Sequence, residues 1–289
     1  MPKTIGKAKK QSEFVRIMKQ LSKNKMAMLG LAILSAEIIL AILSPYIIPY
    51  DYSFMDMINT FAKPSFQHPF GCDDMGRDIF SRILYGARYS ISIGIIAVGI
   101  GTVLGCTIGA TAGYFGGRVD NIIMRFLDII QAIPGMLLMI VISAVLGPGY
   151  FNTIIALSIG SISGMARMLR AQMLKERENE YIEAAQSINC SKFRIIVSHL
   201  LPNCISPMIV SATMGVAQTI TVAAGLSFIG LGVQPPTPEW GAMLAGARQF
   251  IRQAPHLVYF PGLAIAVTVL ALNLLGDGLR DALDPKLKN

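Results

Sequence analysis

EYIEAAQSINCSKFRIIVSHLLPN, from Glu180 to Asn203, is the longest polar interval in the second half of a chain that is otherwise mostly apolar. Near its start stand Glu183, Ala184 and Ala185, and all three residue types favour helix. The two alanine side chains are small enough to let another surface approach closely. The stretch therefore predicts a short polar helix with a compact tip, placed between two apolar segments.

A turn is expected after this short helix. Asn189 is second only to glycine in tolerating the left-handed backbone conformation in which helices end. Ser191 can then cap a new helix, and Pro202 suits the first turn of the next apolar segment. We therefore expect two helices that meet at a turn, with Ser187 close to the end of the first.

The composition is that of a membrane protein. The chain has 289 residues, of which 53% are hydrophobic and 15% are charged. A soluble domain carries about 25% charged residues, and a helix needs about 20 apolar residues to cross a bilayer. We expect an all-α integral membrane protein with about six transmembrane helices. The expected spans are about 26–50, 89–114, a third that ends near Leu146, 152–173, 204–232 and 258–275.

The net charge of +8 is concentrated at the N-terminus, just before the first span. Basic residues in this place, without a pattern of interleaved aromatic residues, favour the positive-inside arrangement of membrane proteins over nucleic-acid binding. Residues 1–25 are interpreted as a basic cytosolic tail. Residues 26–50 are interpreted as an uncleaved anchor, because a signal peptide would have a shorter apolar core and a small-residue cleavage site. The basic residues of the tail are Lys3, Lys7, Lys9, Lys10, Arg16, Lys19, Lys23 and Lys25.

Three residues within the expected spans need an explanation. Glu37 is costly in lipid, so it is expected to face protein or a polar cavity. Asp128 follows Arg125 by three residues, which favours a local ion pair over a role in ion binding. Pro134 predicts a kink in the third span.

Residues 51–88 are expected to form an extracytoplasmic loop, with the charged segment HPFGCDDMGRD at 68–78. The spacing predicts a turn and then a short helix, on which four charged residues pair three or four positions apart. These residues are Asp74, Arg77, Asp78 and Arg82.

Cysteines and histidines predict neither a disulfide framework nor a metal site, since no CxxC spacing and no Cys/His pairing is present. The histidines are interpreted as lone surface or interfacial residues. The residues concerned are Cys72, Cys106, Cys190, Cys204, His68, His199 and His256.

A row of glycines marks the second span, at Gly101, Gly105, Gly109 and Gly113. Residues four apart lie along one face of a helix, and the missing side chains let another helix backbone approach closely. The row therefore predicts tight helix packing.

Four signatures resemble those of ABC importer permeases of the oligopeptide/dipeptide (peptide/nickel) family, C-type subunit. They are the Glu183-Ala184-Ala185 loop, the segment 68–88, the segment 226–241 (LSFIGLGVQPPTPEWG) and the segment 273–285. In the second of these, the matching residues include Gly71, Asp73, Gly76, Arg77 and Asp78. The chain departs from the family pattern in three places: Asn189 replaces a glycine, Cys72 replaces a threonine, and Ala223-Ala224 replaces an acidic residue.

The resemblance implies a type I ABC importer permease fold, with residues 89–289 as a core of five transmembrane helices and a coupling loop at 175–202. It implies that Glu183, Ala184, Ala185, Ser187 and Asn189 dock on a cytoplasmic ATPase subunit. It also implies a heterodimer with a homologous permease, two cytoplasmic ATPases that bind ATP and Mg, and an extracytoplasmic substrate-binding protein. Motion of the ATPases would then drive alternating access for di- or oligopeptides, with nickel, a metal chelate or glutathione as alternative cargoes.

The distribution of basic residues predicts the orientation in the cell membrane. With six spans and both termini in the cytoplasm, six of the 25 Lys and Arg residues lie outside. This asymmetry favours a cytosolic coupling loop. The six are Lys63, Arg77, Arg82, Arg88, Arg248 and Arg252.

Two other classes of function fit the sequence less well. An intramembrane enzyme would need a nucleophile, but the Gly160–Gly164 segment (GSISG) has Ile162 at its centre and no HExxH motif is present. A channel or secondary transporter usually has internal repeats and polar groups at mid-membrane, and here only Glu37, Asp128 and Asn273 qualify. The chain also lacks GxxxxGK[ST], so no nucleotide cofactor is expected on it.

Overall fold

The computed structural model describes residues 13–283, which fold into helices joined by loops. Lys3, Lys7, Lys9 and Lys10 of the expected basic tail, and the last six residues of the chain, lie outside the described residues. Within residues 13–283 the only β-type pairing is an isolated bridge between Cys72 and Asp78. The helices are α1 (Glu13–Leu21), α2 (Lys25–Ile47), α3 (Ile79–Phe115), α4 (Gly117–Gln131), α5 (Gly135–Leu146), α6 (Tyr150–Arg177), α7 (Glu180–Ser187), α8 (Lys192–Arg194), α9 (Leu201–Phe228), α10 (Trp240–Ala247) and α11 (His256–Leu283).

The expectation of an all-α membrane protein is confirmed. Five helical segments are long and apolar enough to cross a membrane, and the pair α4 and α5 makes a sixth if it counts as one span. These two helices are bent by 82° where they meet. Pro134 lies directly before α5, where a proline cannot donate to the helical hydrogen-bond ladder. The expected kink is therefore a complete break between two helices.

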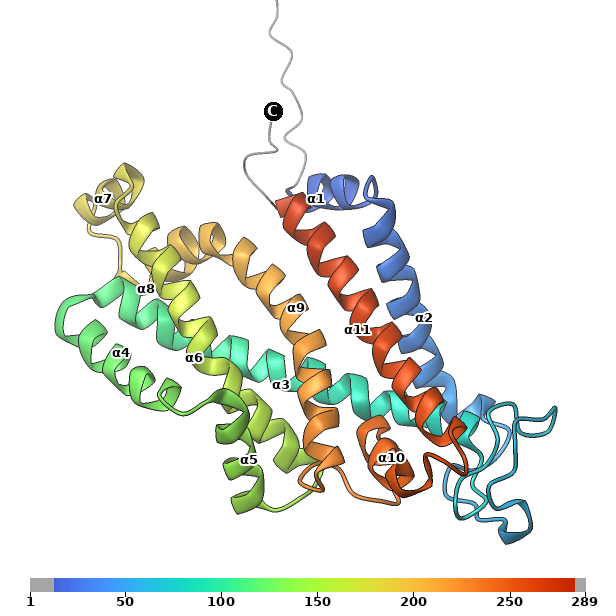
Figure 1. The fold of residues 1–289 in the computed structure, drawn as a ribbon. Helices are drawn as coiled ribbons and strands as arrows, with labels where there is room; N and C mark the ends of the chain where they lie inside the picture. Colours follow the sequence, from blue (N-terminus) through green and yellow to red (C-terminus); the bar gives the residue numbers. More distant parts are fainter. Residues whose placement is uncertain (1–12, 284–289) are drawn as a thin grey trace, which may run out of the picture.

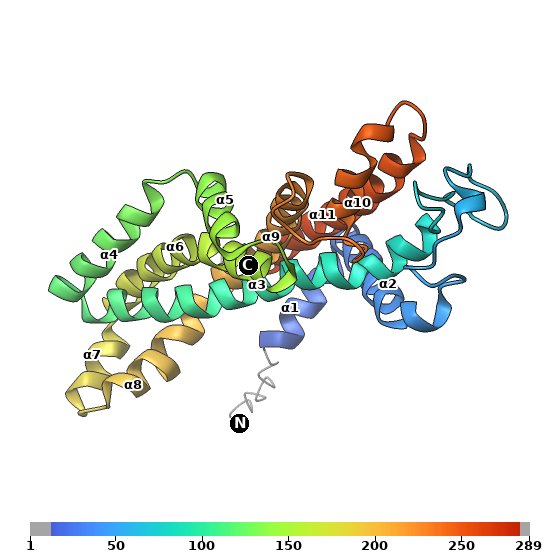
Figure 2. The same cartoon turned by 90° about the horizontal axis from the view of Figure 1, so that it is seen from below.

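The elements are arranged along α3, which has 37 residues and runs the length of the molecule in Figure 2. Helix α6 packs along one half of α3, while α2 and α11 pack side by side near the other half (Figure 1). Helix α9 contacts α3, α6 and α11. Helix α7 lies at one extremity, which we call the α7 end, and the loop 48–78 lies at the opposite one, which we call the loop end.

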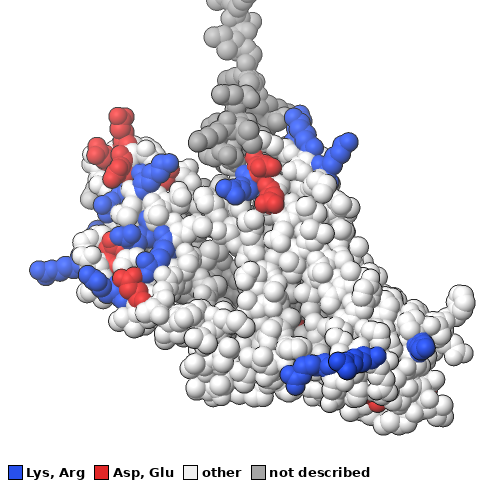
Figure 3. All heavy atoms as spheres, in the orientation of Figure 1, with Lys and Arg blue, Asp and Glu red and all other residues white. Residues whose placement is uncertain are grey.

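Charged side chains are concentrated on two opposite sides of the molecule. On the face in Figure 3, Lys, Arg, Asp and Glu gather over α4 and α6 to α8 and again over α1, the start of α2 and the end of α11, and a short row of basic side chains lies near the loop end. The wide band between them is almost entirely uncharged. This is the distribution expected of a protein whose middle is in contact with lipid.

Helix α3 begins earlier than the sequence predicts. Its first residue is Ile79, so the final ten residues of the expected loop 51–88 form its first turns. The fifth segment is also longer, because residues 192–228 are continuously helical. Residues Ile195–Leu200 join α8 to α9 in a π-helical conformation, and Pro202 lies in the first turn of α9 as expected.

Glu37 faces protein, as expected from its position in the first span. Its Oε2 atom accepts a hydrogen bond of 2.9 Å from the Thr268 hydroxyl of α11. The carboxyl group of Glu37 on α2 therefore has a hydrogen-bond partner on α11 and does not face lipid without one.

Candidate functional site

Helix α7 is fixed to the rest of the chain by one face. Ile182 and Ala185 are buried in a core cluster that includes Leu169 and Met173 of α6 and Ile195. Glu183, Ala184 and Ser187 are exposed on the opposite side. The helix thus presents a polar outer face and a buried apolar face, and only the outer face can meet another protein.

Ala185 does not lie on the outer face. Its side chain is 7% exposed, so a larger residue there would collide with the chain's own core. The prediction that both alanine side chains face another surface is wrong for Ala185, which packs inward, and stays a prediction for the exposed Ala184.

The turn after α7 has the predicted conformation. Asn189 has a φ of 55°, in the left-handed region, and the Cys190 amide donates to the Ala185 carbonyl at 3.0 Å. Ser191 then caps α8 by accepting from the Arg194 amide at 3.4 Å. Ile188, at the tip of the turn, is 80% exposed.

Polar contacts hold the base of α7. The Tyr181 hydroxyl donates to Glu176 at 2.9 Å and accepts from the Asn203 amide at 2.9 Å. Burial raises the pKa of Tyr181, and the hydrogen bond that the hydroxyl donates to Glu176 acts in the same direction. Arg177 donates to the Tyr114 carbonyl at 3.0 Å, which joins the end of α6 to the end of α3.

Glu183 borders an open groove of about 580 Å³ between α7 and the end of α3. The same groove is lined by Arg177 and Lys192, with Phe115 and Gln186. Lys192 also lies over the Phe115 ring, 5.6 Å from its centre. The groove therefore combines one carboxylate with two cations beside the exposed tip of α7.

The loop end is built around the segment Gly71 to Asp78. Gly71 and Gly76 have φ of 79° and 72°, and a side chain on Gly71 would press against His256 at 2.9 Å. Asp73 accepts from the amides of Met75 and Arg77, both at 2.9 Å. The two glycines are required by the backbone path, and Asp73 closes the turn between them.

Of the pairs expected in this segment, Asp74 and Arg77 lie 3.6 Å apart as predicted, but they are not on a helix and the other contacts differ from the expected scheme. Asp74, Arg77 and Asp78 precede the helix, because Asp78 is the N-cap of α3 and accepts from the Ser81 amide at 2.7 Å. Arg77 donates to Asp73 at 2.6 Å, and Arg82 donates to the Tyr52 carbonyl at 2.9 Å. A carboxylate at a helix N-terminus and a tight turn thus replace a self-paired helix face.

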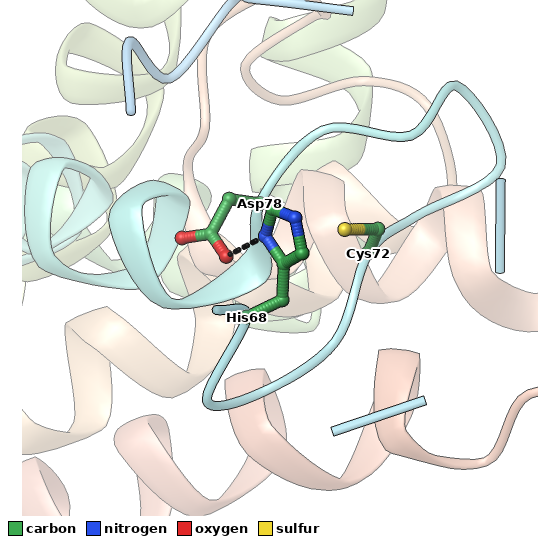
Figure 4. Close-up of side chains that lie close together, drawn as sticks. All are labelled: His68, Cys72 and Asp78. Carbon is green, nitrogen blue, oxygen red and sulfur yellow. Dashed lines mark hydrogen bonds and ion pairs between the residues drawn. The ribbon is translucent and has the colours of Figure 1, made fainter. Parts of the chain in front are cut away.

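His68 is not a lone surface residue. Its Nδ1 atom lies 2.9 Å from Asp78 Oδ1, with both side chains buried (Figure 4). Tyr50 stacks on the His68 ring. Cys72 lies beside His68 and Asp78, and the side-chain atoms of the three residues that could bind a metal ion lie within 4.8 Å of one another. Burial, and then the neighbouring Asp78 and Asp73, raise the pKa of Cys72 to about 12. Asp78 is already engaged by His68 and Ser81, so the arrangement fits a hydrogen-bonded clamp better than a set of free metal ligands.

The glycine row of α3 lies against α6. A Cβ atom on Gly101 would collide with Ser161, and one on Gly109 with the Ala166 carbonyl. On Gly105 it would lie 2.7 Å from the Ile162 carbonyl. The backbones of α3 and α6 therefore approach at a distance that a side chain would prevent.

Asp128 pairs with a different arginine from the one expected. Its partner is Arg167 of α6, and Asp120 likewise pairs with Arg170. Two ion pairs therefore connect α4 to α6 across a sequence separation that spacing within one helix cannot reveal.

A third polar cluster was not predicted. Glu239 is buried and caps α10 by accepting from the amides of Gly241 and Ala242 at 2.9 and 2.8 Å. Burial raises its pKa. Trp240 is buried and donates to the Ile83 carbonyl of α3 at 3.1 Å. The sequence signal that could have revealed the cap is an acidic residue directly before an apolar helix.

Two families have sequence models that match this chain. The family described as "Binding-protein-dependent transport system inner membrane component" matches residues 101–289. The family described as "N-terminal TM domain of oligopeptide transport permease C" matches residues 12–68.

Curated relatives match almost the whole chain. The dipeptide transport system permease protein DppC of Alkalihalophilus pseudofirmus is 47% identical over 94% of this chain and 89% of its own length. The glutathione transport system permease protein GsiD of Escherichia coli is 48% identical over 91% of this chain and 87% of its own length.

Among solved structures, the MetNI methionine ABC transporter in an inward-facing conformation resembles this fold with a TM-score of 0.57. It has 18% identity and covers 70% of this chain and 96% of the matched chain. At this identity the likeness concerns the fold alone.

Proposed function

The chain belongs to the family of binding-protein-dependent inner-membrane transport components, within the oligopeptide permease C type, and on that premise we propose that it is the membrane-spanning subunit of an ATP-driven importer of short peptides. The relatives named above are permeases of dipeptide and glutathione transport systems. Glutathione is itself a small peptide, so both relatives favour short peptides over nickel or a metal chelate as the cargo of this chain.

The observation that carries this proposal is the geometry of α7. A short helix projects at one end of the molecule, with Ile182 buried beneath it and Glu183 and Ala184 exposed on it. A helix held on one side and bare on the other is suited to entering a cleft of a second protein. We assign this surface, together with Ser187, Ile188 and Asn189, to contact with an ATPase subunit.

The remaining parts of the importer follow from this assignment. The α7 end and both termini lie in the cytoplasm, and the loop end with Gly71–Asp78 lies outside. ATP and Mg are bound by two partner ATPases, while this chain supplies no hydrolytic group. A homologous permease completes the pathway, and a substrate-binding protein delivers the cargo at the loop end. Closure of the ATPases pushes on α7 and opens the pathway outward.

The test uses the complete importer, with the partner permease, both ATPases and the binding protein, in proteoliposomes. Ala184→Leu combined with Glu183→Lys should lower the rate of uptake of a labelled dipeptide by about tenfold or more. Overpacking a close contact costs about 1–3 kcal/mol, and the new lysine would face Arg177 and Lys192 across the groove. The ATPase subunits should be lost on purification.

Ala36→Leu on α2 serves as the control, because Ala36 is also exposed but lies in the first membrane span. It should leave uptake and ATPase co-purification unchanged. Normal uptake by the α7 double variant would contradict the assignment of this surface to the ATPase.

A further inference from the structure

A cavity of about 340 Å³ lies within the membrane-spanning part, between α5, α6 and α9. Ligand pockets in proteins have volumes of about 300 to 1,000 Å³, so this one is large enough for a small molecule. None of the described residues that line it is charged. Any ligand it takes is therefore held by uncharged groups.

One wall of the cavity carries hydrogen-bonding groups that the chain itself does not use. Gln218 is exposed on α9, well inside the span, and its side chain takes part in none of the hydrogen bonds among residues 13–283. Ser211 donates only to the Met168 sulfur, at 3.3 Å, and a thioether is a weak acceptor. Polar side chains within membrane helices face the protein interior or a water-filled cavity, because lipid offers them no partner.

Two glycines keep the cavity wide. A Cβ atom on Gly164 would meet no atom within 4 Å, and one on Gly215 would meet only Val98, at 3.7 Å. Glycine within a helix is about 1 kcal/mol less favourable than alanine. Unlike Gly105 and Gly109, these glycines are not needed for contact between helices of this chain. Their small size therefore leaves space for a ligand or for another protein chain.

The remaining lining is adaptable. Met139, Met165 and Met168 contribute three flexible, polarisable side chains from α5 and α6. Methionine fills irregular spaces and is common on surfaces that accept partners of varied shape. The cavity thus has hydrogen-bonding groups on α9 and a methionine wall that can change its shape.

We propose that this cavity is the chain's share of the substrate path, where Gln218 and Ser211 bind the main-chain amide groups of a peptide and the methionines accommodate its variable side chains. The glutamine amide both donates and accepts, so it pairs with a peptide bond in the way that another peptide bond does. The inference rests on the proposed function, because a peptide cargo is what requires recognition that ignores side-chain charge.

The first experiment asks whether the cavity is wet in the assembled importer. Gln218→Cys, on a background with Cys72, Cys106, Cys190 and Cys204 replaced by serine, is treated with a water-soluble maleimide. Labelling is expected, and it should be slowed by excess dipeptide with the binding protein. An unlabelled cysteine would mean that lipid or a helix of the partner permease covers this surface, and would overturn the proposal.

The second experiment measures recognition. Gln218→Leu should lower uptake about three- to tenfold, the effect of one lost hydrogen bond, by the same factor for dipeptides with acidic, basic and apolar side chains. Thr221→Val is the control, since Thr221 is also on α9 but outside the cavity lining. Unchanged uptake, or a loss confined to one class of side chain, would contradict main-chain recognition.

A third variant tests the space itself. Gly164→Leu should block uptake while the complex still assembles. Gly225→Leu, at another glycine with no atom near its Cβ position but outside the lining, should not. Uptake by the unaltered complex tests the proposed function separately: if the unaltered complex carries no peptide, the proposed function fails, whereas peptide uptake that Gly164→Leu leaves normal rejects only the cavity.

Discussion

Single carboxylates hold the loop end together. Asp73 is buried and accepts hydrogen bonds from two backbone amides and from Arg77. Its neighbour Asp74 is more exposed and reaches Arg77 only at 3.6 Å. The two adjacent aspartates thus differ greatly in burial and in the number of hydrogen bonds that they accept.

Asp73→Asn should therefore destabilise the protein much more than Asp74→Asn. Removing one partner of a buried ion pair costs about 3–5 kcal/mol, whereas a partly exposed pair contributes about 0–1 kcal/mol. Thermal unfolding of the detergent-solubilised importer compares the two variants directly. Equal midpoints for both would show that the buried pair does not stabilise the turn.

At the scale of the helices, α3 and α6 form the closest pair. Their contact depends on the glycines of α3, since a larger residue at any of these positions would place its side chain against the backbone or side chains of α6. Van der Waals contact at this distance is a main source of affinity between membrane helices. The arrangement has no tolerance for a larger residue.

Gly109→Leu should prevent correct packing of α3 on α6, because its Cβ would meet the Ala166 carbonyl. Gly99→Leu, on the same helix, is the matched change, since a Cβ at Gly99 would meet no atom of a neighbouring element within 4 Å. Yield of folded protein by size-exclusion chromatography should fall severely for the first variant only. A well-folded Gly109→Leu protein would show that α3 and α6 can separate without loss of the fold.

Over the whole molecule, charge predicts orientation. Ser187 at the α7 end and Lys63 at the loop end should lie on opposite sides of the membrane. Cysteines placed singly at these positions, on a background without native cysteines, should react with an impermeant reagent in intact cells only at position 63. Reaction at position 187 from outside would reverse the orientation and remove α7 from the cytoplasm.

The sequence predicts those parts of the molecule that depend on local chemistry. The left-handed Asn189 and the break near Pro134 each follow from one residue's backbone preference, and the Ser191 cap follows from the hydrogen-bonding capacity of one side chain. Partners far apart in the chain do not follow in this way. Arg167 is 39 positions from Asp128, and the inward direction of Ala185 is set by the α6 and α9 side chains around it.

The glycine contact between α3 and α6 has a mechanical consequence. Helix α3 is about 55 Å long at 1.5 Å per residue, and it begins directly after the His68–Asp78 clamp. Helix α6 ends next to α7 and is tied to the far end of α3 through Arg177. Because the two backbones are in close contact at Gly101, Gly105 and Gly109, α3 and α6 are expected to move together over this half of α3. If α7 docks on an ATPase subunit as proposed, a displacement applied at α7 would be passed through α6 to α3, and along α3 towards the loop end.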